Sequence, residues 1–130
     1  MYLELNGTKY EVSTNLGTAY EIEKKYNKKV GAILENIDDK EIDQIIPILY
    51  IGFKRKNPTI TEEEFKNKVL EDEKMTYTTF FREVSVFCNL CVSMRETEEE
   101  VRARINALFE GEAEEIKERL EELKANKGKN

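Results

Sequence analysis

The chain has 130 residues, of which 39% are hydrophobic and 37% are charged, and its formal net charge is −6. Histidine is absent and cysteine occurs only twice, which excludes histidine-based catalytic triads, histidine metal sites and imidazole acid–base catalysis. The acidic balance also argues against a nucleic-acid binder, because such proteins neutralise phosphates with a basic face. These features predict one domain built from amphipathic helices.

Strand alternation marks the N-terminal segment, where an Asn-Gly pair separates two runs of alternating apolar and polar side chains. The pattern predicts a β-hairpin that turns at the Asn-Gly pair. Because a two-stranded hairpin is marginally stable alone in water, its apolar face is expected to pack on the helices that follow. That face comprises Leu3, Leu5, Tyr10 and Val12.

Helical periodicity begins after Asn15, the last of three residues that favour the N-cap position. A short break at residues 27–29 separates two predicted apolar stripes. The first comprises Leu16, Ala19, Tyr20 and Tyr26, and the second comprises Val30, Ile33, Leu34 and Ile37.

A third helix is expected to start from a cap at Asp38 or Asp39 and to end at the three cations of residues 54–56. Pro47 lies inside this segment. Since proline lacks the N–H and clashes with the preceding turn, it predicts a kink or a break near residues 44–46.

Two further helices are predicted before residue 95. Thr61 and Glu64 form a capping-box pattern that opens a short acidic helix. Its apolar residues are Phe65, Val69 and Leu70. Residues 77–94 form the least polar helix, and a stripe this wide belongs at the centre of the fold or in an interface. The stripe comprises Tyr77, Phe80, Phe81, Val84, Phe87, Cys88 and Cys91.

The C-terminal segment is rich in charged helix formers, and Thr97 and Glu100 form a second capping-box pattern at its start. Gly111 interrupts the apolar pattern, so the segment is expected to be one helix with a weak point or two short helices. From Phe109 to Leu123 the apolar residues follow a short heptad-like spacing. The candidate partner-binding residues are Val101, Ile105, Phe109, Ile116, Leu120 and Leu123.

The predicted fold is therefore mainly α, with an N-terminal β-hairpin packed on a bundle of about five to six helices and a long charged C-terminal helix. Residues 1–95 are expected to form the hairpin and helical core. Residues 96–130 are expected to form an amphipathic helix that either belongs to the same domain or binds a partner.

Few residues in the sequence suggest a catalytic or metal-binding role. Cys88 and Cys91 form a C-x-x-C pattern, but no second pair or histidine completes a zinc site, so both are expected to act as small core hydrophobes. The many carboxylates fall in first helical turns or on solvated faces. We therefore assign no catalytic, cofactor-binding or metal-ligating residue and expect a protein that is not an enzyme.

The sequence also carries little sign of a membrane or secretory role. Its longest uncharged apolar run, residues 45–53, is much shorter than the roughly 20 residues that a membrane-spanning helix needs. The N-terminal segment lacks the pattern of a secretory signal. A cytoplasmic protein without membrane or nucleic-acid partners is the expectation.

The order of these segments resembles that of the tail assembly chaperones of long-tailed bacteriophages and related prophages. The likeness covers about residues 1–75. It rests on the hairpin of residues 3–12, the helix start at 15–19, the segment Ile-Ile-Pro-Ile-Leu-Tyr-Ile-Gly-Phe-Lys at 45–54 and the segment Asn-Pro-Thr-Ile-Thr-Glu-Glu-Glu at 57–64. The charged segment after residue 94 departs from the family pattern.

The resemblance implies a non-enzymatic role in the cytoplasm of the infected host. Such chaperones bind the long helical tape-measure protein, keep it soluble and help recruit tail-tube subunits, and they are not retained in the mature virion. The family is often made in two lengths by ribosomal frameshifting, and this chain is similar to the shorter product. Two alternatives stay open: a small acidic helical adaptor or self-associating domain unrelated to tails, which includes a homo-oligomer, and an enzyme of unrecognised type.

Overall fold

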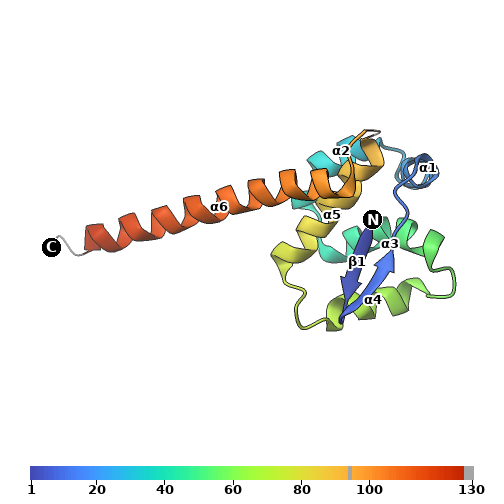
Figure 1. The fold of residues 1–130 in the computed structure, drawn as a ribbon, viewed down its shortest axis with the longest axis horizontal. Coiled ribbons are helices and arrows are strands. Elements are labelled where there is room, and N and C mark those ends of the chain that lie inside the picture. Colours follow the sequence, from blue (N-terminus) through green and yellow to red (C-terminus); the bar gives the residue numbers. More distant parts are fainter. Residues whose placement is uncertain (94, 128–130) are drawn as a thin grey trace.

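The computed structural model describes residues 1–93 and 95–127, and within these the side chains outside 111–117 and 125–127. The described chain is mainly helical and begins with a two-stranded antiparallel hairpin, as predicted (Figure 1). It contains six α-helices and one short 3-10 helix. The elements are β1 (Tyr2–Leu5), β2 (Thr8–Glu11), α1 (Leu16–Tyr26), α2 (Val30–Glu35), η1 (Ile37–Asp39), α3 (Ile42–Lys56), α4 (Glu62–Glu71), α5 (Tyr77–Val92) and α6 (Glu98–Lys127).

The hairpin turns at the Asn-Gly pair, as the sequence predicts. Asn6 and Gly7 both have positive φ angles, 51° and 79°, which the favoured two-residue hairpin turn requires. Leu3 and Leu5 on β1 are almost completely buried, as is Val12 just after β2. The backbone N–H of Asn6 also donates to Asp72 at 3.1 Å, which ties the turn to the end of α4. The hairpin therefore packs on the helical core and covers one side of it.

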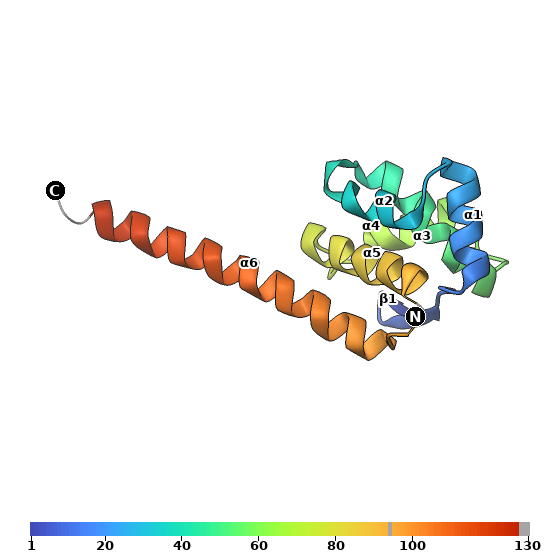
Figure 2. The same ribbon diagram turned by 90° about the horizontal axis from the view of Figure 1, so that it is seen from above.

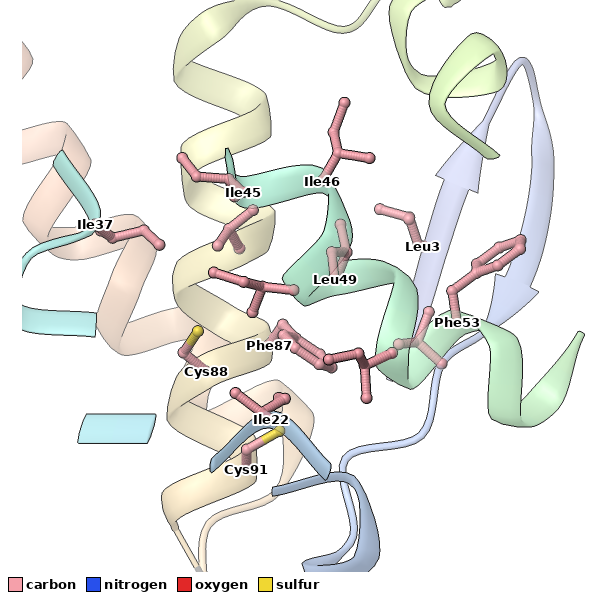
Figure 3. Close-up of a cluster of buried hydrophobic side chains, with 14 of the residues drawn as sticks. Leu3, Ile22, Ile37, Ile45, Ile46, Leu49, Phe53, Phe87, Cys88 and Cys91 are labelled. Atoms are coloured by element: carbon pink, nitrogen blue, oxygen red, sulfur yellow. The ribbon is translucent and has the colours of Figure 1, made fainter. Parts of the chain in front are cut away.

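Helix α5 is the centre of the fold. It contacts α1, α2, α3 and α6, and its buried face contains seven residues. Figure 3 shows Phe87 pointing from α5 toward α3 and the side chain of Leu49. The prediction that this apolar stripe lies at the centre of the fold is confirmed, although the helix ends at Val92 and Tyr77 is exposed at its start. Met94 lies outside the described residues.

Aromatic side chains join α3 to α4 and to the hairpin. The rings of Phe53 and Phe65 lie 4.4 Å apart between centroids, and Tyr10 of β2 stacks on Phe53 at 5.4 Å. Phe53 and Phe65 are completely buried. Aromatic pairs at these separations add to the free energy gained from burial alone.

The apolar face predicted for α1 is wrong in part. Ala19 is buried and Tyr26 packs against the core, as predicted, but Leu16 and Tyr20 are 71% and 63% exposed. The helix also buries Thr18 and Ile22. The hydroxyls of Thr18 and Ser13 lie 2.7 Å apart and form a buried hydrogen bond. This bond satisfies the polar group that Thr18 places inside the core, beside the buried Ile22.

The cap predicted for α3 is wrong, and so is the predicted break near Pro47. The N-cap residue is Glu41, whose backbone carbonyl accepts from the N–H of Gln44 at 2.9 Å while the Gln44 side chain accepts from the N–H of Glu41 at 2.9 Å. Asp38 belongs instead to η1. Pro47 does not break the helix, which continues through it to Lys56, because packing on both sides of the proline offsets one missing backbone hydrogen bond.

Of the other local predictions, two helix caps are confirmed and one apolar contact is wrong. The caps predicted at Asn15 and Thr61 are confirmed, since each side chain accepts a hydrogen bond from the backbone N–H three residues later. On α4, Phe65 and Val69 are buried but Leu70 is 53% exposed. Leu70 follows Val69 by one residue, which places it about 100° round the helix and away from α3.

Helix α6 is a single helix that passes through Gly111. Its first turns lie beside α5, and the rest projects away from the body formed by the other elements (Figures 1 and 2). The Thr97 hydroxyl accepts from the N–H of Glu100 at 3.2 Å, as the capping-box pattern predicts. No helix within the described residues is both long and apolar enough to cross a membrane.

Candidate interaction surface

The base of α6 packs on α5 through a small second apolar cluster. Val101 and Ile105 are 0% and 4% exposed and lie against Val86, which is also buried. Phe109 is half-buried at the edge of this cluster, and the guanidinium of Arg82 lies 5.3 Å from the centre of its ring. Two of the six candidate partner-binding residues, Val101 and Ile105, therefore face their own chain, and the surface on offer to a partner begins beyond them.

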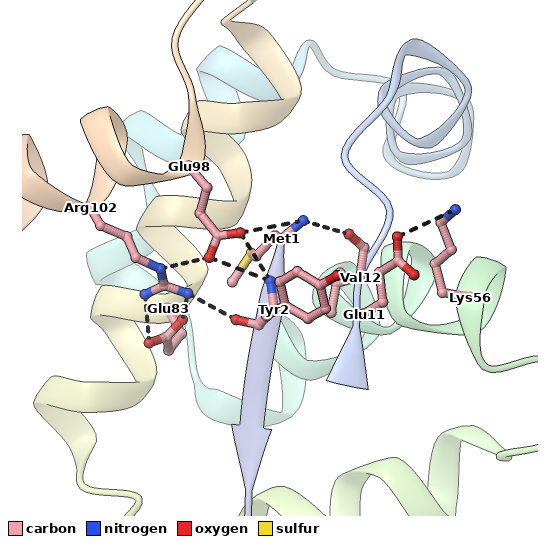
Figure 4. Close-up of polar contacts among 8 residues, drawn as sticks. All are labelled: Met1, Tyr2, Glu11, Val12, Lys56, Glu83, Glu98 and Arg102. Carbon is pink, nitrogen blue, oxygen red and sulfur yellow. Dashed lines mark hydrogen bonds and ion pairs between the residues drawn. The ribbon is translucent and has the colours of Figure 1, made fainter. Parts of the chain in front are cut away.

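A charged cluster holds the same turns of α6 in place. The guanidinium of Arg102 donates to both carboxylate oxygens of Glu83 on α5, at 3.0 and 2.9 Å, and to Glu98 at 2.8 Å. It also donates to the backbone carbonyl of Tyr2 at 3.0 Å, and the N–H of Tyr2 donates to Glu98 at 3.1 Å (Figure 4). One side chain therefore joins α6, α5 and β1.

The side chains of this charged cluster are partly buried. Its side chain is 27% exposed and that of Glu83 is 17% exposed. Burial alone lowers the pKa of Arg102, but the hydrogen bonds and charges of Glu83 and Glu98 outweigh burial and raise it. Bidentate pairs of this kind are among the stronger ionic contacts in proteins. The first turns of α6 are thus a fixed part of the folded unit.

Beyond the anchored turns, α6 carries exposed apolar side chains. Leu120 and Leu123 are 53% and 57% exposed, and because they are three residues apart they share one side of the helix. Leu108 is 61% exposed at the point where α6 leaves the body. Ile116, also a candidate, lies outside the described side chains. The far half of α6 is therefore a projecting helix with leucines that its own domain does not cover.

The cysteine pair lies in the main core. Cys88 and Cys91 are free thiols, 0% and 8% exposed, on the buried face of α5 (Figure 3). Burial raises the pKa of each thiol to about 12, with the neighbouring Cys91 adding to the shift at Cys88. A thiol with so high a pKa is a poor nucleophile and a poor metal ligand at neutral pH. The described residues contain no group of three or more side chains placed to hold a metal ion.

Comparison with known proteins finds no match for this chain among family models, curated proteins or solved structures. The strongest candidate surface is the exposed half of α6.

Sequence patterns indicated this helix but missed the role of Arg102 in fixing its first turns. Its spacing of four residues from Glu98 was the one available signal, and the contact with Glu83 depends on the packing of α6 on α5.

Proposed function

We propose that this chain is a tail assembly chaperone that binds and solubilises the tape-measure protein of a long-tailed phage or prophage. The proposal includes help in recruiting tail-tube subunits, a non-enzymatic mode of action, and a place in the host cytoplasm rather than in the mature virion. The observation that carries it is the projecting half of α6 with Leu120 and Leu123 exposed. The segment order of residues 1–75, which resembles that family, supports it independently.

The geometry suits capture of a helical partner. A tape-measure protein is long and helical, and one helix can cover another by burying apolar residues spaced three and four apart. Helix α6 has 30 residues, so it is about 45 Å long, and its first turns are fixed by Arg102 and the Val86 cluster. A fixed base holds the exposed leucines clear of the body, where a second helix can lie alongside them.

The expected contribution of the two leucines can be estimated from their exposure. Complete burial of a leucine is worth about 1.5–3 kcal/mol, and each of these side chains is a little over half exposed. Covering both should contribute about 2–3 kcal/mol to association. That corresponds to roughly a 30- to 150-fold change in the dissociation constant.

The test is a pull-down of the tape-measure protein of the same phage, with co-expression to measure its soluble yield. Leu120→Gln with Leu123→Gln should abolish most capture, because it removes apolar surface without changing charge. The matched control is Glu118→Gln with Glu122→Gln, which changes charge on the opposite side of the same turns and should leave capture intact. Capture should depend little on salt. Full capture by the leucine variant would place the contact elsewhere on the chain.

The second candidate is a helical adaptor or self-associating domain unrelated to tails. The heptad-like spacing from Phe109 to Leu123 favours it, because the same spacing can pair two copies of α6. Sedimentation separates the two proposals. A dimer that dissociates in the Leu120→Gln, Leu123→Gln variant, together with no capture of a tape-measure protein, would favour self-association.

A further inference from the structure

A second surface lies on the body of the molecule, apart from α6. A cleft of about 350 Å³ opens where the end of α1, the α1–α2 connection, α2 and the first half of α3 meet. Its floor is apolar. Ile33 and Ile48 are buried there, and Tyr26 and Pro47 are half-buried.

Three lysines from three separate segments form the rim of this cleft. They are Lys25 near the end of α1, Lys28 in the connection that follows, and Lys40 between η1 and α3. Among the described residues, none of the three forms an ion pair, although the protein as a whole is acidic. The Lys25 ammonium instead lies 5.6 Å from the centre of the Tyr26 ring. Cations gathered without counterions around an apolar floor favour a ligand that is both anionic and apolar.

The rim also has an oriented amide. The Oε1 atom of Gln44 accepts the backbone N–H of Glu41 at 2.9 Å, which fixes the plane of the side-chain amide at the edge of the cleft. Its NH2 group is then available as a donor for a carboxylate. In the part of the chain that the structure describes, the lining of the cleft contains Lys25, Lys28 and Lys40 and no acidic residue, so it carries a net positive charge. One carboxylate, that of Glu62, is near enough to Tyr26 to add to the burial that raises the pKa of this tyrosine.

We propose that this cleft docks an acidic peptide segment of a partner protein, with an apolar side chain on the floor and carboxylates beside Lys25, Lys28 and Lys40. The inference is independent of the proposed role of α6.

Other occupants fit less well. The exposed leucines of α6 in a second copy are flanked on the helix by Arg119 and Lys124, which would repel the lysine rim. An inorganic anion would leave the apolar floor uncovered. A larger cleft, of about 580 Å³, carries the opposite charge and would repel the same peptide. Its acidic residues are Glu4, Glu71, Asp72, Glu73 and Glu83.

The test uses the full chain and a fluorescein-labelled peptide in which leucines alternate with glutamates at helical spacing. Binding is measured by fluorescence anisotropy, and the site is located by amide chemical shifts. We expect saturable binding with shifts concentrated at Gln44 and Ile48. Affinity should fall severalfold between about 50 and 500 mM salt, because the contact is largely ionic.

Matched variants separate a local site from net charge. Lys25→Glu, Lys28→Glu and Lys40→Glu together should weaken binding roughly tenfold or more. The control changes Lys24, Lys29 and Lys54 to Glu, which alters the net charge equally without touching the cleft and should bind as the wild type does.

Four results would overturn the proposal. The first two are an equal loss of affinity in the control variant and equal binding of a peptide with lysines in place of glutamates. The third is that inorganic phosphate alone produces the same chemical-shift changes. The fourth is a set of concentration-dependent shifts at the cleft without peptide, which would show that a second copy of the chain occupies the cleft. The cleft and the exposed half of α6 share no residues, and capture by α6 is expected to be insensitive to salt. Failure of the acidic peptide to bind would therefore leave the tape-measure test unaffected.

Discussion

Gly52 is the position where the packing of α3 most strictly limits side-chain size. A Cβ added there would lie 2.5 Å from the ring of Phe87 and 2.5 Å from the backbone carbonyl oxygen of Ser13. Phe87 is completely buried, and the N–H of Ser13 donates to the Gly52 carbonyl at 3.0 Å, so neither neighbour can move away freely. Gly52→Ala should therefore force α3 away from both α5 and the segment that follows the hairpin.

The size of the effect follows from two opposing contributions. Overpacking a well-packed core costs about 1–3 kcal/mol, and an immovable backbone atom places this case at the upper end. Alanine is favoured over glycine in a helix by about 0.5–1 kcal/mol, which offsets part of the cost. The expected net loss is about 2 kcal/mol in the free energy of unfolding, or a fall of roughly 8 °C in Tm for a chain of this size.

The matched control is Gly31→Ala in α2. A Cβ added at Gly31 meets no atom within 4 Å, so only the helix preference acts. This variant should gain about 0.5–1 kcal/mol. Thermal unfolding followed by circular dichroism, with urea titration as a second measure, should order the proteins as Gly31→Ala, wild type, Gly52→Ala. A Gly52→Ala protein as stable as the wild type would refute the packing described between α3 and α5.

Three other predictions address the caps, the ionic anchor and the thiols. Asn15→Ala should cost about 1 kcal/mol in urea unfolding, because it removes the acceptor for the first turn of α1. Arg102→Met should cost about 2 kcal/mol, because Glu83 loses its ion-pair partner and Glu98 keeps only the N-terminal ammonium and the N–H of Tyr2, and amide exchange should speed up across residues 98–109. Cys88 and Cys91 should resist a thiol reagent at pH 8 until the protein unfolds. Since their pKa is raised to about 12, their contribution to stability is complete below the unfolded pKa of about 8.5 and is lost as pH rises toward 12. A double alanine variant should lack this alkaline loss.

Local signals in the sequence were sufficient for much of the fold. A cap such as Asn15 or Thr61 acts within four residues, so its pattern predicts the helix start directly. The Asn-Gly pair likewise fixes the turn of the hairpin. The width of the apolar stripe on α5 indicated a central helix because so many apolar residues need partners on several sides.

The errors arose where tertiary contacts decide between local alternatives. On α1, Tyr20 faces solvent whereas Thr18 is buried, and the hydroxyl of Thr18 has a partner only because the fold brings Ser13 next to it. Asp38 and Asp39 belong to η1, which places Ile37 in the core, so α3 starts only after Glu41. The lysine-rimmed cleft could not be predicted, because its cations come from segments that only the folded chain brings together.

The candidate surface on α6 was predictable only in part. Heptad-like spacing indicated an amphipathic helix, yet spacing alone does not tell which of its residues face the chain and which face solvent. Val101 and Ile105 pack on Val86, whereas Leu120 and Leu123 remain exposed. The division between them reflects the angle at which α6 leaves α5, which is held by Arg102.

Amide hydrogen exchange of the full chain, measured with and without the tape-measure protein that is its proposed partner, tests the proposed function most directly. In the free chain, residues 118–124 should exchange quickly and residues 98–105 slowly, because only the latter pack on α5. On binding, we expect strong new protection at residues 118–124 and little change in the core helix α5. Unchanged exchange at residues 118–124, with the tape-measure protein demonstrably bound, would contradict the assignment of α6 as the partner-binding helix.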